Sequence, residues 1–246
     1  MIRSVKTLRK TTVDATDGRI GVVTQVFFDD ERWTIRYLIV RTDKEFDERR
    51  VLISPMAVSG RSEGDPGAIR VRLTRRQVAV SPDIDSDKPV SRQKELEYNR
   101  YYLLPSYWDG TNLWGAWTAP SQLISQAVEK PPTGTPSADI HLRSSREVIG
   151  YEVKAVDSWL GSVKDFLYDD STWRIRFIET STRRWVGGRR VLVPPAWIHA
   201  ISWAERTISL DLPRRMVRGA PAYDSPKTLT PEFLDRMRAY YSREVE

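Results

Sequence analysis

The most regular pattern along the chain is a two-residue alternation of apolar and polar positions, which is typical of half-buried β-strands. Two stretches rich in β-branched and aromatic residues, 21–28 and 33–40, flank the acidic pair Asp29-Asp30. They predict a long β-hairpin. Aspartate suits its turn, because a carboxylate can accept hydrogen bonds from nearby backbone amides.

Shorter segments extend this pattern to several strands. Residues 51–53 form an apolar run that ends at Pro55, as a strand should where proline removes a ladder donor, and residues 69–73 alternate cleanly. Helix formers gather in two places, 91–102 and 231–241, and Thr230 is placed to cap the second helix. So many short strands predict a mainly β fold, in which a small closed barrel would leave no strand edge exposed.

An internal repeat organises the whole chain. When residues 16–58 are placed on residues 156–198, a shift of 140, fourteen of the 43 positions are identical without a gap. The chain of 246 residues therefore contains two copies of one domain, and we expect them to be related by a pseudo-two-fold axis. The predicted boundaries are 1–102 for the first barrel and its helix, 103–139 for a linker, and 140–246 for the second barrel and its helix.

The linker changes character along its length. Its second part, EKPPTGTPSAD, is rich in proline and glycine and predicts a flexible connector. Its first part holds Tyr107, Trp108, Trp114 and Trp117, which is too aromatic for a solvated linker. Two interpretations stay open: these residues pack the linker between the barrels, or they form a surface that binds a partner, a task for which aromatic anchors are suited.

Composition narrows the possible chemistry. The chain has no cysteine, which excludes disulfides, thiol nucleophiles and iron–sulfur clusters, and only two histidines, His141 and His199. No apolar run approaches the roughly 20 residues that span a bilayer, and the first residues lack the apolar core of a signal peptide. We expect a cytoplasmic protein, with peripheral membrane association left open.

The repeated elements GVVTQVFFDD, WTIRYLIV and RRVLISP, and again GSVKDFLYDD, WRIRFIET and RRVLVPP, resemble the PRC-barrel family. This family includes the cytoplasmic domain of the photosynthetic reaction-centre H subunit and the C-terminal domain of the ribosome maturation factor RimM. The resemblance covers both copies and implies a six-stranded barrel that serves as an interaction module. It implies no catalytic residues.

Candidate catalytic residues all have simpler structural interpretations. Asp29-Asp30 and Asp169-Asp170 could act as acid and base or bind a hard cation, but each pair stands where a turn is needed. Neither His141 nor His199 has a histidine counterpart in the other copy, and no nucleotide-binding, hydrolase or metalloprotease motif occurs. We therefore predict no catalytic, cofactor-binding or metal-binding residues, and no enzyme.

Paired arginines recur at equivalent places and offer another kind of site. The pairs are Arg49-Arg50, Arg75-Arg76, Arg189-Arg190 and Arg214-Arg215. They could form two matched basic stripes that hold RNA or an acidic protein surface, although acidic neighbours such as Glu45, Asp47 and Glu48 favour internal pairing. Trp33 and Trp173, which occupy matched positions in the two copies, are expected to pack inside the barrels.

The sequence thus predicts a non-catalytic scaffold or adaptor that binds another protein through its barrels and the Trp-rich linker. The residues predicted to contact the partner are Tyr107, Trp108, Trp114, Trp117, Arg49, Arg50, Arg189 and Arg190. A homo-oligomer is a further option. The alternative function is an RNA-associated or ribosome-associated factor that uses the paired arginines.

Overall fold

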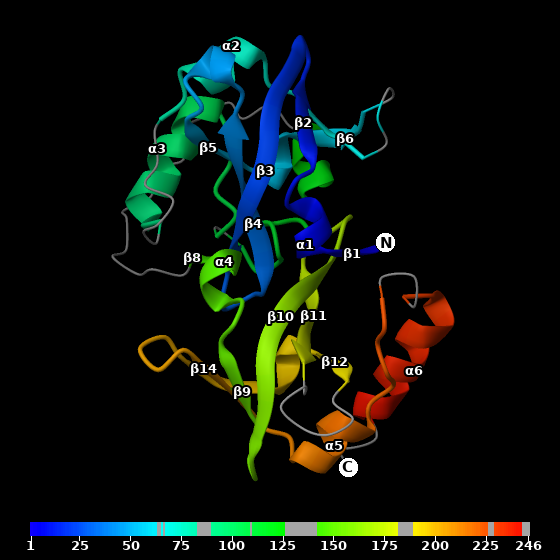
Figure 1. Ribbon diagram of the computed structural model, residues 1–246. Helices are drawn as coiled ribbons and strands as arrows, with labels where there is room; N and C mark the ends of the chain where they lie inside the picture. Colours follow the sequence, from blue (N-terminus) through cyan, green and yellow to red (C-terminus); the bar gives the residue numbers. More distant parts are fainter. Residues whose placement is uncertain are drawn as a thin grey trace. The chain divides into compact units, whose positions relative to one another are not determined.

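The computed structural model describes residues 1–62, 65, 67–82, 90–108, 110–125, 142–181, 189–225 and 229–242. In these residues the chain is mainly β, as predicted, with two seven-stranded sheets and short helices (Figure 1). The α-helices are α1 (Val5–Leu8), α2 (Arg75–Ala79), α3 (Arg92–Tyr102), α4 (Ser145–Val148), α5 (Arg214–Gly219) and α6 (Pro231–Ser242). The 3-10 helices are η1 (Lys44–Phe46), η2 (Pro55–Ala57), η3 (Pro120–Ser125) and η4 (Pro195–Trp197).

The chain forms two compact units. Unit 1 contains Met1, residues 5–146 and residues 169–174, whereas unit 2 contains residues 2–4, 147–168 and 175–246. The predicted boundaries, 1–102, 103–139 and 140–246, stay predictions, and the described residues 103–108 and 110–125 of the predicted linker lie within unit 1. The proline-rich part of the linker and His141 lie outside the described residues. The pseudo-two-fold relation stays a prediction.

The sheet of unit 1 is built around one long hairpin. Its strands are β2 (Thr12–Ala15), β3 (Gly18–Asp29), β4 (Thr34–Thr42), β5 (Arg50–Ile53), β6 (Val58–Arg61), β7 (Ile69–Val71) and β8 (Leu142–Ser144). They lie in the order β5-β4-β3-β2-β7-β6, with β8 on β3. The edge strands of this sheet are β5 and β6, which are joined along the chain through η2. No described strand pairing links β5 with β6, so the described pairings do not form a closed barrel. Buried residues of β3, β4 and β5, such as Val26, Leu38 and Val51, belong to the core of unit 1.

The sheet of unit 2 repeats this plan. Its strands are β1 (Ile2–Ser4), β9 (Glu152–Lys154), β10 (Trp159–Asp169), β11 (Ile175–Ser181), β12 (Arg190–Val193), β13 (Ile198–Ser202) and β14 (Thr207–Leu210). They lie in the order β12-β11-β10-β9-β14-β13, with β1 on β10. Even the irregularities recur: the register shifts of the β3–β4 hairpin, at 23/25 and 27/28, match those of the β10–β11 hairpin at 163/165 and 167/168.

The hairpin turns confirm the predicted role of aspartate. Asp29 Oδ1 accepts hydrogen bonds from the backbone amides of Glu31 (2.9 Å) and Arg32 (3.0 Å). Asp169 Oδ1 does the same in the second copy. Each turn ends in a buried tryptophan with positive φ, 52° at Trp33 and 62° at Trp173. A shared turn geometry therefore explains why these residues recur.

The C-terminal helices of the units also follow the sequence pattern. Helices α3 and α6 begin after Ser91 and Thr230, and each hydroxyl accepts a hydrogen bond from the third residue along. The buried face of α6 carries Phe233, Met237 and Tyr241. Leu234, which follows Phe233 in this helix, is half-buried.

One strand of each sheet comes from the other half of the sequence. In unit 1, β8 pairs antiparallel with β3, and the Ser144 hydroxyl donates to Gln25 Oε1 (2.8 Å). In unit 2, β1 pairs with β10, and the Ser4 hydroxyl donates to Asp165 Oδ2. Ser4 and Ser144 are equivalent in the repeat, as are Gln25 and Asp165. Neither unit can therefore be completed by its own repeat alone.

Ser4 and Ser144 provide a test of these two strand pairings. Ser4→Ala should lower the unfolding free energy by about 1.5–3 kcal/mol, because it takes a donor from a buried carboxylate, and Ser144→Ala by only about 0.5–1.5 kcal/mol, because the acceptor is neutral. Amide hydrogen exchange should rise in β10 for the first variant and in β3 for the second. An equal or larger cost for Ser144→Ala, or exchange that rises in the opposite sheets, contradicts the assignment.

Candidate interaction site

A fully buried arginine lies at the centre of the candidate site in unit 1. Arg36 stands on β4 among apolar residues, and its side chain has no exposed surface. Its Nη2 donates to Asp29 Oδ2 at 3.0 Å. Because the other oxygen of Asp29 accepts the turn amides, one carboxylate both shapes the hairpin turn and balances the buried charge. Such pairing is needed, since an unpaired buried charge is very unfavourable.

The guanidinium of Arg36 holds the aromatic part of the predicted linker. We call residues 106–108 and 110–117 the aromatic segment. Arg36 Cζ lies 3.9 Å from the ring centroid of Tyr107 and 4.8 Å from that of Trp114, and its Nη1 donates to the carbonyl oxygen of Leu113. The indole nitrogen of Trp114 donates to the carbonyl oxygen of Thr172 at 2.8 Å, also within unit 1. Stacking and hydrogen bonding thus fix the segment at several points.

A buried carboxyl group on α3 provides a second anchor. Glu95 Oε2 accepts the Tyr107 hydroxyl at 2.6 Å and the Tyr37 hydroxyl at 3.2 Å, while Glu95 Oε1 lies 3.1 Å from Arg92 Nη1. Burial raises the pKa of Glu95 from 4.5 to about 7, and this outweighs the lowering by Arg92, by the two tyrosine hydroxyls and by Arg36. Burial, together with Glu95, also raises the pKa of Tyr37 and of Tyr107.

The four aromatic residues predicted to contact a partner divide into two pairs. Tyr107 and Trp114 are buried, with 3% and 0% of their surfaces exposed, so they anchor the segment rather than face solvent. Trp108 and Trp117 are each partly exposed. Trp108 stacks under the Arg92 guanidinium at 4.2 Å, and the backbone of Trp117 pairs with that of Trp114. The site therefore has a buried anchoring side and a partly exposed side.

Sequence reasoning missed Arg36 and Glu95, although a signal existed for the first. Arg36 recurs as Arg176 in the second copy, yet Arg176 is exposed. Where unit 1 has Tyr37 and Glu95, the second repeat has Phe177 and Leu234. The arginine was thus visible as a matched residue, but its burial depends on an aromatic segment that follows the first repeat only.

The arginine pairs predicted to bind a partner mostly make contacts inside their own units. Arg49 donates to the carbonyl oxygens of Ala79 and Ser81, and Arg189 donates to that of Ala220, which is equivalent to Ser81. Arg190 lies 3.4 Å from the buried Glu179 and over the ring of Tyr223. Arg50 is exposed. Arg49 and Arg189 therefore hold the chain at the ends of α2 and α5, respectively.

A second set of arginines, at the start of the short helices, is also engaged. Arg75 forms an ion pair with Glu45, and its backbone amide donates to Asp17. The amide of Arg214 donates to Asp157 in the same way, so the two copies share this contact.

The acidic pairs and the remaining histidine behave as structural groups. Beyond the turn contacts, Asp30 pairs with Arg143 (3.1 Å) and Asp170 with the amino group of Met1 (2.7 Å), both in unit 1. His199 is exposed and lies 3.2 Å from Asp211. The described part of the chain contains no group of three or more acidic or imidazole side chains arranged for a metal. It also contains no helix long and apolar enough to cross a membrane.

Removal of the buried charge should release the aromatic segment. Arg36→Met leaves Asp29 buried without its cation, so we expect a loss of about 3–5 kcal/mol in unfolding free energy and faster proteolysis within 106–117. The matched control is Arg176→Met, an exposed site, with an expected change of about 0.5 kcal/mol or less. Urea denaturation measures both, and equal effects from the two variants contradict a special role for Arg36.

The raised pKa of Glu95 also predicts a pH dependence. The folded chain holds this proton more tightly than the unfolded chain, so the unfolding free energy should fall as the pH rises from 4.5 towards about 7 and change little above. We expect Glu95→Gln to remove about 2 kcal/mol of the decrease between about pH 5.5 and about pH 8. Urea denaturation at several pH values checks this, and an unchanged slope in the variant contradicts it.

Comparison with protein-family models matches residues 141–215 to the PRC-barrel domain. The match runs from the start of β8 into α5, and so covers most of the sheet of unit 2. The PRC-barrel domain is a generic non-catalytic β-barrel module. No curated protein matches the chain. Residues 141–215 of the second repeat are thus similar to the PRC-barrel domain, and unit 1 repeats the strand order and register shifts of unit 2.

Proposed function

We propose that the protein is a non-catalytic adaptor of tandem PRC-barrel type that binds a protein partner through the aromatic segment of unit 1. One observation carries this proposal: a fully buried arginine, paired with Asp29, fixes the segment by stacking on Tyr107 and Trp114. The exposed parts of Trp108 and Trp117 are then held in place before any partner arrives.

Preorganisation is what makes such a surface effective. Binding is opposed by the entropy lost when side chains and loops become ordered, and that cost is smaller where the segment is already fixed. Tryptophan is among the residues that contribute most at protein interfaces, because it buries a large apolar surface with few rotatable bonds. The anchors Tyr107 and Trp114 remove flexibility from the chain that carries Trp108 and Trp117.

The RNA-associated alternative uses the paired arginines and has less support. Arg49, Arg75, Arg189 and Arg190 already contact carbonyl oxygens or carboxylates within their units. A phosphate backbone would have to compete with those contacts. The paired arginines therefore favour RNA less than the aromatic segment favours a protein partner, and cytoplasmic location and self-association stay predictions.

The test compares partner capture by full-length variants. Trp108→Ala with Trp117→Ala should reduce capture of a co-purifying protein about tenfold or more, because the exposed indoles are lost while the buried anchors remain. Affinity purification from the source organism with quantitative mass spectrometry measures the loss. Trp203→Ala, which alters a partly exposed tryptophan of unit 2 outside both proposed surfaces, is the matched control and should capture as the wild type does.

Circular dichroism and thermal unfolding must first show that the double variant is folded. Capture that is equal in the double variant and the wild type overturns the proposal. So does capture that disappears on nuclease treatment and with Arg50→Gln, because that result supports the RNA-associated alternative.

A further inference from the structure

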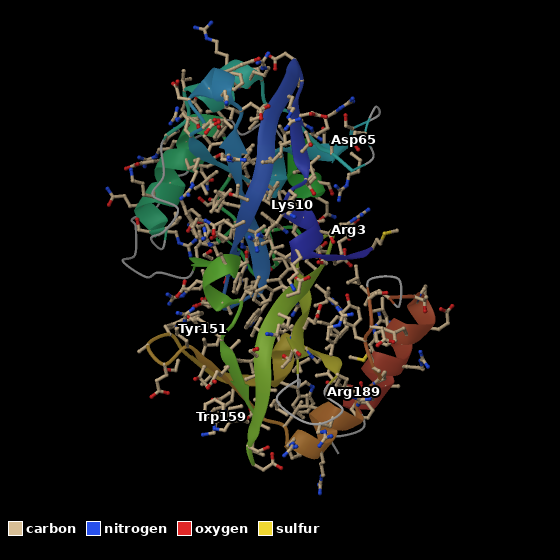
Figure 2. The ribbon with its side chains drawn as sticks, viewed as in Figure 1. Arg3, Lys10, Asp65, Tyr151, Trp159 and Arg189 are labelled. Atoms are coloured by element: carbon tan, nitrogen blue, oxygen red, sulfur yellow. The ribbon has the colours of Figure 1, made fainter. Side chains whose placement is uncertain are left out.

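A second surface, in unit 2, exposes apolar side chains where a soluble hairpin would carry polar ones. The β9–β10 hairpin ends in residues 155–158, and Val156 and Trp159 are 66% and 46% exposed. Figure 2 labels Trp159 near this end of the hairpin. Their neighbours Ala155 and Leu160 are buried, so the backbone at the tip is held against the sheet while Val156 and Trp159 face outward.

The tip is rigid at its base and lies beside the start of α5. The amide of Ala155 donates to the carbonyl oxygen of Ser158 (2.8 Å), and the amide of Val156 donates to that of Leu212 (3.1 Å). Asp157 Oδ1 accepts the amide of Arg214 at 2.8 Å. The hairpin end and α5 therefore contribute to one surface, which we call the unit 2 tip: Lys154, Val156, Asp157, Trp159, Arg214, Arg215 and Arg218.

This surface combines apolar and basic groups. Lys154 is exposed, pairs across the hairpin with Trp159 and lies with its Nζ 5.6 Å from the indole ring. Arg215 and Arg218 are exposed on α5, one turn apart. With Arg214, the unit 2 tip contains four cations and one acid, Asp157, whose carboxylate accepts the backbone amide of Arg214. Tryptophan with flanking lysine and arginine is the combination that favours the interface of an anionic bilayer.

The first repeat supplies an internal comparison. At the positions of Lys154, Val156 and Trp159 it has Asp14, Thr16 and Arg19, and at the position of Arg218 it has Ala79. Its tip cations Arg19 and Arg75 form ion pairs with Asp43 (3.0 Å) and Glu45, respectively, whereas Arg76, the counterpart of Arg215, is exposed. The same fold therefore tolerates a more polar tip with more acidic residues, so the apolar and basic character of the unit 2 tip is not required for folding.

We propose that the unit 2 tip docks on an anionic lipid bilayer, with Trp159 and Val156 entering the headgroup region and the surrounding cations contacting lipid phosphates and carboxylates. This surface is separate from the aromatic segment and does not rest on the protein-binding proposal. Docking of this kind is peripheral and reversible, because the apolar area is small and the electrostatic part weakens with salt.

The experiment uses the full chain and vesicles of phosphatidylcholine with or without phosphatidylserine. Co-sedimentation should show binding to the anionic vesicles that decreases with salt, and little binding to phosphatidylcholine alone. Val156→Ser with Trp159→Ser should weaken binding on the order of tenfold, and Arg215→Gln with Arg218→Gln on the order of twentyfold, or about fivefold for each cation. Brominated lipids should quench wild-type fluorescence more than that of the Trp159→Ser variant, which reports insertion of this indole.

The matched control changes the equivalent tip of unit 1, Thr16→Ser with Arg19→Ser, and should leave binding unchanged. All substituted side chains are partly or largely exposed, and unchanged thermal unfolding confirms that each variant folds. Absence of binding to anionic vesicles overturns the proposal, as does binding that survives both unit 2 variants. Affinity for RNA without affinity for vesicles, lost in Arg215→Gln with Arg218→Gln, overturns it in favour of a nucleic-acid surface.

Discussion

The buried pair of Arg36 and Asp29 is the interaction on which the organisation of unit 1 depends. A guanidinium without exposed surface requires a counter-charge, acceptors for its protons and flat groups against its faces. Asp29 supplies the counter-charge, Asp29 and the carbonyl oxygen of Leu113 accept hydrogen bonds, and the rings of Tyr107 and Trp114 lie against the faces, while Nε has no hydrogen-bond partner among the described residues. A hairpin turn, a strand and a segment about 75 residues further along the chain are thereby coupled through one side chain.

The two repeats show how a duplicated domain can diverge without a change of fold. Both sheets have the same strand order, the same register shifts and the same aspartate turn. They differ in the residues around this shared sheet: unit 1 has an aromatic segment over Arg36, and unit 2 has an apolar, basic hairpin end. Partner binding and lipid docking, as proposed, would then be divided between copies that share one architecture.

Local patterns in the sequence identified the elements but not their long-range partners. The hairpins around Asp29 and Asp169 could be predicted because alternation and turn chemistry are properties of neighbouring residues. The burial of Arg36 could not, because identical arginines in the two repeats have opposite environments that depend on residues 106–117. The pairing of β1 with β10 was likewise invisible, since a three-residue strand carries too little pattern to specify a partner more than 150 residues away. The equivalent roles of Ser4 and Ser144 follow only from the strand pairings of both sheets.

The pairing of β1 with β10 and of β8 with β3 also constrains how the chain folds during synthesis. An N-terminal domain commonly folds while the rest of the protein is still being made. Here the sheet of unit 1 lacks β8 until residue 144 has left the ribosome, and the first strand of the chain must wait for β10 before it has a partner. During that interval Ile2–Ser4 and the edge of β3 that later receives β8 are unprotected, and exposed strand edges favour wrong pairing between chains. Neighbouring nascent chains on one messenger could therefore exchange these strands with each other, so dimers made during translation are an expected by-product of this topology.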